Sequence, residues 1–197
     1  MDYALTLLPQ ANYVCDTFTT VSPFNAEAYM GIWYEQHHVK DEYFQKNSWT
    51  CNTAQYSHLT ADGHFTVSNT SETAHQFGSR FGVTGKAQCP DPTVASCYVG
   101  FFGNYTNYPN YNVLDTDYET YSIVYTCDPS GKGKPFLWLM ARQPVADQAL
   151  VDQMMAKAKS MLPNFDFATL AARDVQGDMC TYPKPIVELA TADYSLQ

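Results

Sequence analysis

Short runs rich in β-branched and aromatic residues alternate with clusters of Gly, Pro, Asn and Asp between Gly31 and Arg142. This pattern is typical of short β-strands joined by turns. The expected strands span residues 31–39, 50–60, 64–70, 80–88, 96–102, 111–116, 119–127 and 135–142. Ala61-Asp62-Gly63 is a candidate hairpin turn, because Asp-Gly tolerates the positive φ that such turns need. Strands with such short links pair with their sequence neighbours, so the pattern predicts an antiparallel meander.

The segment from Asp147 to Leu162 has a different period. Its apolar residues recur at helical spacing, at Leu150, Val151, Met154, Ala158, Met161 and Leu162. Asp147 is a candidate N-cap, and Pro163 stops the pattern. A single amphipathic helix after a meander has to pack on the outer face of the sheet, so its methionines are expected to fill core space. A further short strand is expected at residues 168–174.

Composition narrows the class of protein. A chain of 197 residues fits one domain, and with 16% charged and 15% aromatic residues it has the composition of a folded protein. The net charge of −9 disfavours nucleic acid and anionic membrane surfaces as partners. The longest strand-like apolar run, Phe136 to Ala141, is too short to span a membrane.

The six cysteines form no Cys-x-x-Cys pair, which disfavours zinc and thioredoxin-like sites. An even number of scattered cysteines indicates disulfides and an oxidising compartment, although six cysteines allow about 15 pairings. Sequons at Asn69 and Asn104 fit a secreted glycoprotein. The start of the chain does not have the pattern of a signal peptide, so we expect a mature chain; a cytosolic protein with six thiols is the alternative.

Three short motifs occur at separate places along the chain, and their order is informative: Gly31-Ile32-Trp33-Tyr34-Glu35, Thr116-Asp117-Tyr118-Glu119-Thr120-Tyr121 and Trp138-Leu139-Met140-Ala141-Arg142. In an eight-stranded meander, counting the chain reversals brings all three to the same end. Together they resemble the lipocalin family, especially its subgroup of apolipoprotein D, bilin-binding insect lipocalins and bacterial lipocalins, from about Phe24 to Cys180. This resemblance implies an all-β, eight-stranded antiparallel up-and-down barrel that holds one small apolar ligand, with the helix packed outside.

The resemblance also implies structural roles and a domain division. Trp33 would close one end of the barrel with Arg142 across its indole face, supported by Gly31, Thr116, Asp117 and Tyr118. Four cysteines match those of the apolipoprotein D group, which implies the pairs Cys15–Cys127 and Cys51–Cys180 and leaves Cys89–Cys97 as an addition. We expect an N-terminal segment at 1–23, the barrel with helix 147–162 at 24–182, and a flexible tail at 183–197.

The opposite end should be open, edged by the links at 41–48, 70–79, 103–110 and 128–134. The first three are rich in aromatic residues, which either grip a ligand or pack on one another. Alternation along the strands turns Phe136, Trp138 and Met140 inward, and turns Glu35 and His37 inward from Trp33. The predicted ligand-binding residues are Glu35, His37, Tyr43, Phe44, Phe77, Tyr105, Tyr108, Tyr111, Phe136, Trp138 and Met140. Within 119–127 two inward sets remain open: Tyr121, Ile123 and Tyr125, or Thr120, Ser122, Val124 and Thr126.

No motif predicts catalysis or a metal site. His37 and His38 are adjacent, so in a regular strand they face opposite sides and cannot share one metal. The sequence therefore predicts a secreted, non-enzymatic carrier of a hydrophobic ligand that requires no cofactor. A bilin or carotenoid chromophore is favoured, with fatty acids, sterols and retinoids as other candidates, and the protein can form a homo-oligomer. The alternatives are an enzyme using Glu35 and His37 as an acid–base pair, or a protein-binding barrel with a filled lumen.

Overall fold

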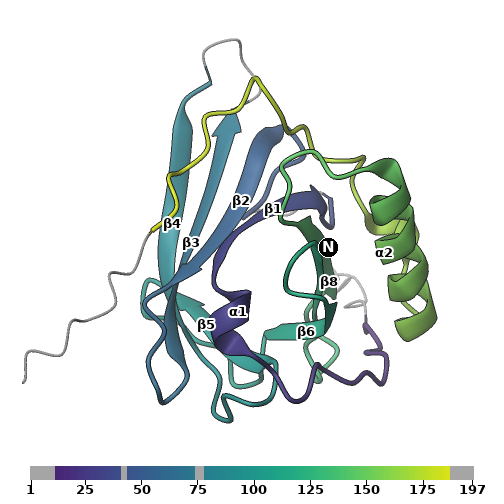
Figure 1. Cartoon of the computed structure of the whole chain (residues 1–197). Coiled ribbons are helices and arrows are strands. Elements are labelled where there is room, and N and C mark those ends of the chain that lie inside the picture. The colour runs from purple at the N-terminus through teal and green to yellow at the C-terminus, as the bar shows by residue number, and fades with distance from the viewer. Residues whose placement is uncertain (1–11, 41–43, 74–77, 187–197) are drawn as a thin grey trace, which may run out of the picture.

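The computed structural model describes residues 12–40, 44–73 and 78–186, in which eight antiparallel strands form a closed barrel (Figure 1). The strands are β1 (Gly31–His37), β2 (Trp49–Ser57), β3 (His64–Thr73), β4 (Arg80–Gln88), β5 (Ser96–Phe101), β6 (Tyr111–Thr116), β7 (Tyr121–Thr126) and β8 (Phe136–Ala141). Each strand pairs with its sequence neighbour, and β8 pairs with β1 to close the barrel. The predicted up-and-down barrel is confirmed.

The hairpin between β2 and β3 shows why the sequence requires glycine at the turn. Gly63 has φ +80°, a conformation that side chains with a Cβ rarely adopt. A Cβ at this position would also lie 2.5 Å from the backbone oxygen of Cys89. Both the turn and the close approach of the two backbones therefore depend on the missing side chain.

Helix α2 (Gln148–Met161) packs outside the barrel against β7 and β8, as predicted (Figure 1). Its buried residues Val151, Met154 and Ala158 share a core cluster with Ile123 and Tyr125 of β7. This packing resolves the two alternatives for β7: Tyr121, Ile123 and Tyr125 face the helix layer, and Val124 and Thr126 face the lumen. Asp147 occupies the N-cap position, although its side chain makes no capping hydrogen bond.

The prediction of a strand at residues 168–174 is wrong. The chain forms a short 3₁₀ helix, η1 (Phe167–Thr169), and then a single β-bridge between Leu170 and Val39. The backbone amides of Ala171 and Asp174 donate to the carbonyls of His38 and Gln36. β1 already pairs with β2 and β8 along most of its length. The extended segment therefore forms hydrogen bonds only with the few free backbone groups at the irregular end of β1, too few for a strand.

Helix α1 (Ala26–Tyr29) was not predicted from the sequence, because one turn is too short to show a helical period. Asn25 caps it: its Oδ1 accepts a hydrogen bond from the amide of Ala28 at 3.0 Å. The helix places Tyr29, which is 1% exposed, inside one end of the barrel. α1 is therefore part of the structure that closes this end (Figure 1).

The structure contains the two disulfides that the resemblance implies, Cys15–Cys127 and Cys51–Cys180, and also the expected additional pair, Cys89–Cys97. The first two join residues 112 and 129 positions apart, so they fix the segments before and after the barrel onto its wall. Cross-links over such long loops stabilise a fold mainly by restricting its unfolded chain.

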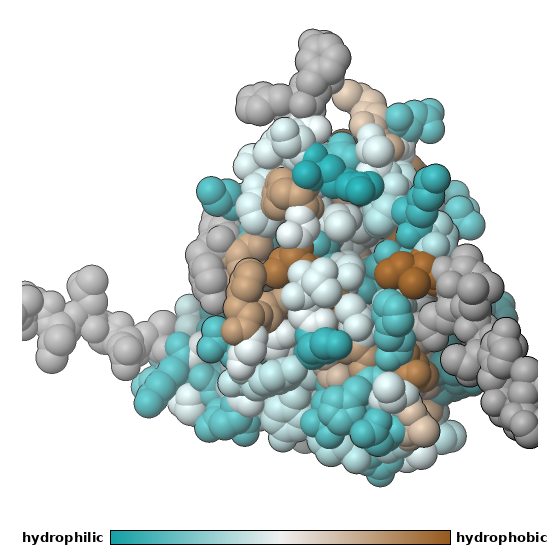
Figure 2. Space-filling view, turned by 90° about the vertical axis from the view of Figure 1, so that its left-hand side faces the viewer, coloured by the Kyte–Doolittle hydropathy of each residue, from teal (hydrophilic) through white to brown (hydrophobic). Residues whose placement is uncertain are grey.

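Hydrophobic side chains gather in two places, inside the barrel and between the barrel and α2. The outer face shown in Figure 2 is mainly polar, with hydrophobic side chains in small separate groups. None of the helices in the described residues has the length and apolar character that a membrane crossing requires.

Candidate functional site: the barrel lumen

One end of the lumen is closed by Trp33, which is fully buried. The guanidinium carbon of Arg142 lies 3.7 Å from the centre of the indole ring. Trp33 Nε1 donates to the carbonyl of Tyr29 at 3.0 Å, and Arg142 donates to the carbonyls of Ile32 and Tyr118, each at 3.0 Å. The guanidinium thus stacks on the indole and donates to backbone carbonyls, and both interactions stabilise the closed end.

The other motif residues hold this plug in place. Gly31 has φ +96°, and a Cβ there would lie 3.2 Å from Nη1 of Arg142. Asp117 Oδ1 accepts from the amides of Thr120 and Tyr121, and Thr116 Oγ1 accepts from the amide of Tyr118. These bonds shape the β6–β7 link so that the carbonyl of Tyr118 faces Arg142. The structure thus brings the three sequence motifs together at one end.

Above this plug lies a cavity of about 730 Å³, within the size range of small-molecule sites. Eight of the predicted ligand-binding residues line it: Glu35, Phe44, Tyr105, Tyr108, Tyr111, Phe136, Trp138 and Met140. Two others, Tyr43 and Phe77, lie outside the described residues. The wall also includes residues that the sequence analysis did not select, among them Val67, Phe81, Val83, Val99 and Phe101. Alternation along the predicted strands was the signal that could have identified Phe81 and Val83.

Some aromatic residues at the open end of the barrel pack on one another, and others are exposed where they can contact a ligand, so both expected roles occur. Phe44 packs on Phe136 with ring centres 5.0 Å apart, and Phe136 stacks on Trp138. By contrast, Phe102 is 87% exposed and Tyr105 is 52% exposed, and both line the cavity. The inner aromatic residues therefore pack on one another, whereas those of the β5–β6 link leave apolar surface free at the entrance.

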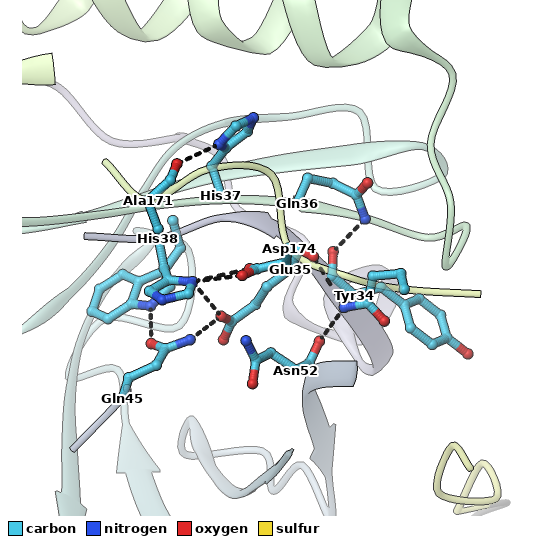
Figure 3. Close-up of polar contacts among 11 residues, drawn as sticks. Tyr34, Glu35, Gln36, His37, His38, Gln45, Asn52, Ala171 and Asp174 are labelled. Carbon is cyan, nitrogen blue, oxygen red and sulfur yellow. Dashed lines mark hydrogen bonds and ion pairs between the residues drawn. The ribbon is translucent and has the colours of Figure 1, made fainter. Parts of the chain in front are cut away.

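The prediction that His37 points inward is wrong. A β-bulge between Glu35 and His37 interrupts the alternation along β1. His37 therefore turns away from the lumen, and its Nδ1 lies 3.2 Å from the carbonyl of Ala171 (Figure 3). The imidazole near Glu35 is that of His38, which is 1% exposed.

Glu35 is the centre of a buried polar group in the lumen wall (Figure 3). Its Oε2 accepts a hydrogen bond from Nε2 of Gln45, whose Oε1 accepts from Trp138 Nε1 at 3.1 Å. On its other side, His38 Nδ1 lies 3.9 Å from Glu35 Oε2 and 2.9 Å from Asp174 Oδ1. Residues from four segments of the chain thus form one polar network around this carboxyl group.

The surroundings shift the proton affinities of this group. Burial, together with the nearby Asp174 carboxylate, raises the pKa of Glu35 to about 7, although His38 and Gln45 act in the opposite direction. Burial lowers the pKa of His38, but its hydrogen bond to Asp174 and the two carboxylates outweigh that effect, so its pKa is raised overall. Glu35 therefore changes charge near neutral pH.

Glu35, His38 and Asp174 also offer ligand atoms within 4.8 Å of one another, a spacing that could accommodate a metal ion. In the observed arrangement, however, His38 Nδ1 faces a carboxylate and has to carry a proton to donate to it. That nitrogen cannot bind a metal at the same time. The sequence analysis missed this group because His38 and Asp174 are far apart in the chain and meet only through the bulge.

Near the closed end, hydroxyl groups form a second polar site. Tyr111 lies 2.6 Å from Tyr56 and 2.8 Å from Tyr29, and Tyr29 lies 2.8 Å from Ser122 Oγ. Burial raises the pKa values of the three tyrosines, that of Tyr29 to about 12, so all are neutral. Three bonds use three of the four hydroxyl protons, which leaves one for another partner.

The two predicted glycosylation sites have different surroundings. Asn69 lines the lumen, with its Oδ1 buried, so a glycan there would have to occupy the cavity, and its use stays a prediction. Asn104 is exposed in the β5–β6 link at the mouth and stays a prediction.

Comparison with known proteins agrees with this architecture. A family model described as a lipocalin-like domain matches residues 24–174. The outer membrane lipoprotein Blc of Citrobacter freundii is 32% identical over 145 residues, which cover 71% of this chain and 74% of Blc. The chain therefore belongs to the lipocalin family.

Solved structures show the same fold. Lobster apocrustacyanin A1 superposes with a TM-score of 0.63 at 20% identity, covering 86% of this chain and 94% of that protein. Insecticyanin from the tobacco hornworm Manduca sexta superposes with a TM-score of 0.65 at 21% identity, covering 86% of this chain and 90% of insecticyanin.

Proposed function

We propose that this lipocalin binds one small hydrophobic molecule in its lumen and carries or sequesters it outside the cell. The observation that carries this proposal is the aromatic cavity of about 730 Å³, closed at one end by Trp33 and Arg142. A site of this kind binds ligand by removing apolar surface from water, with a few polar groups to orient it. Three disulfides support an extracellular location.

We propose a bilin or carotenoid chromophore as the first ligand to test, with fatty acids, sterols and retinoids as competitors. The proposal rests on the resemblance to bilin-binding insect lipocalins and on the flat aromatic rings of Tyr111, Phe136 and Trp138 in the wall. Such rings favour elongated or planar conjugated molecules, which can stack on them.

Native mass spectrometry of the protein from its own source tests both proposals and also gives its oligomeric state. A retained mass with a visible absorption band would support a pigment. A colourless protein that releases only fatty acid would remove the pigment proposal but keep the binding function. A protein without retained ligand that also binds no apolar probe would contradict the function itself.

A further inference from the structure

The cavity wall has an unbalanced charge. Among the described residues that line it, Glu35 is the one ionisable acid or base other than tyrosine; no Lys, Arg or His of this part of the chain is included. Among these described residues, a ligand carboxylate in the lumen would therefore find no cation to pair with. It would instead meet the like charge of Glu35, which is costly in a buried site.

The neighbours of Glu35 leave its charge uncompensated. His38 supplies one positive charge when protonated, but it is shared between two carboxylates and lies 2.9 Å from Asp174 and 3.9 Å from Glu35. The hydrogen-bond donor to Glu35 Oε2, Gln45, is neutral. Two acids and one base in a buried group thus leave a net negative charge, which either a proton or a bound cation removes.

We propose that Glu35 binds a protonated nitrogen on an otherwise apolar ligand, so that the lumen selects amphiphilic amines and rejects carboxylic acids. This inference rests on the proposed binding function and specifies its ligand class. The ammonium group of the ligand would bind to the carboxylate of Glu35. The apolar part of the ligand would lie along Met140, Trp138 and the opposite wall of the cavity. A charge-assisted hydrogen bond in a site shielded from water is stronger than a bond between neutral groups.

A nitrogen cation fits this group better than a metal ion does. Of the three candidate metal ligands, Glu35 lines the cavity, whereas His38 and Asp174 do not. His38 and Asp174 are also bonded to each other, and His38 Nδ1 would have to lose its proton and this hydrogen bond to bind a metal. An ammonium group needs only the carboxylate that the lumen already presents.

The inference separates the candidate ligands. A fatty acid would have to keep its carboxylate away from Glu35, at the mouth. A bilin could place a protonated pyrrole nitrogen at Glu35 only with its carboxylates in the solvent. A carotenoid lacks nitrogen and would gain nothing from the carboxylate.

Three probes of equal chain length test the proposal: decylamine, decan-1-ol and decanoic acid, measured by calorimetry below their aggregation concentrations. At about pH 8 the amine is protonated and Glu35 is ionised. We expect the amine to bind about tenfold more tightly than the alcohol, and the acid to bind most weakly. Glu35→Gln should remove the amine preference while affinity for the alcohol remains.

Two further variants control for folding and for general charge effects. Glu119→Gln makes the same substitution at an exposed residue of the β6–β7 link, outside the cavity, and should leave the order of the three probes unchanged. Asn69→Asp adds a carboxylate to the lumen side of β3, two strands from β1, with almost no change in size, and should increase the amine preference. It therefore tests whether a carboxylate in the lumen wall confers an amine preference, even if Glu35→Gln does not fold.

The outcomes separate this inference from the proposed function. Equal affinities for amine and alcohol, or an amine preference that persists in Glu35→Gln, would overturn the inference and leave the lumen as a binding site. Zn²⁺ binding that is lost in both Glu35→Gln and His38→Ala would overturn it by identifying a metal site. If none of the three probes binds the unmodified protein, the proposed function fails.

Discussion

The closed end contains a partly buried charge and the Glu35 group a buried one, and the protein stabilises the two charges in different ways. At the closed end, Arg142 donates to backbone carbonyls and stacks on Trp33, so its charge is matched within the protein. At the lumen wall, Glu35 receives a hydrogen bond from neutral Gln45 and shares His38 with Asp174. In a structural site the protein itself supplies every partner of a charged group, whereas in a binding site one partner is left for the ligand to supply.

The largest effect is expected at the closed end. Trp33→Ala removes a fully buried indole and the surface on which Arg142 stacks, so the free energy of unfolding should fall by about 3–5 kcal/mol. Urea unfolding measures this change. Trp49→Ala is the matched control, because Trp49 packs on Phe81 near the open end and is only partly buried. Equal losses in the two variants would contradict the special role of the plug.

The second prediction concerns pH and Glu35. Its pKa of about 7 in the folded protein exceeds the ordinary 4.5, so the folded state binds the proton more tightly. This contribution to stability is complete below about pH 4.5 and is lost as pH rises through 7, by about 3 kcal/mol in total. The raised pKa of His38 acts in the same direction. The titratable groups around Glu35 in the described residues are His38, Asp174 and Tyr56.

Urea unfolding at about pH 6 and about pH 8 checks this prediction. The unmodified protein should lose stability between these two values, and Glu35→Gln should lose much less because it cannot ionise. An identical pH dependence in both proteins would show that Glu35 is not strained by its surroundings, and its contrast with Arg142 would disappear.

A third prediction tests the lumen without touching either charge. Val83→Trp places a bulky indole in the cavity, whereas Thr84→Trp places it on the exposed side of the same strand, β4. The first variant should weaken binding of an apolar probe about tenfold or more, which corresponds to about 1.4 kcal/mol. The second should leave it unchanged. Calorimetry with decan-1-ol measures both, and equal affinities would place the ligand elsewhere.

The same contrast explains what could be predicted from the sequence. The closed end was predictable because Gly31, Trp33 and Arg142 belong to local motifs whose positions follow from counting strands. The inward direction of Phe136, Trp138 and Met140 followed from alternation. Alternation failed at His37, because a bulge is set by pairing with β8 and leaves no local pattern. Asp174 joined the site through a segment that the sequence predicted as a strand.

The smallest effect is expected at Gln45, which joins Glu35 to Trp138. Gln45→Ala removes the donor that stabilises the ionised carboxylate, so the pKa of Glu35 should rise further. The corresponding loss in stability at high pH should be about 1 kcal/mol, the usual contribution of one hydrogen bond. The midpoint of the pH-dependent tryptophan fluorescence measures the pKa of Glu35, because Trp138 belongs to the same polar group and loses its partner, Gln45, in this variant. An unchanged midpoint would mean that Gln45 fills space without changing the pKa of Glu35. Packing would then stabilise this part of the lumen wall, as Arg142 stabilises the closed end.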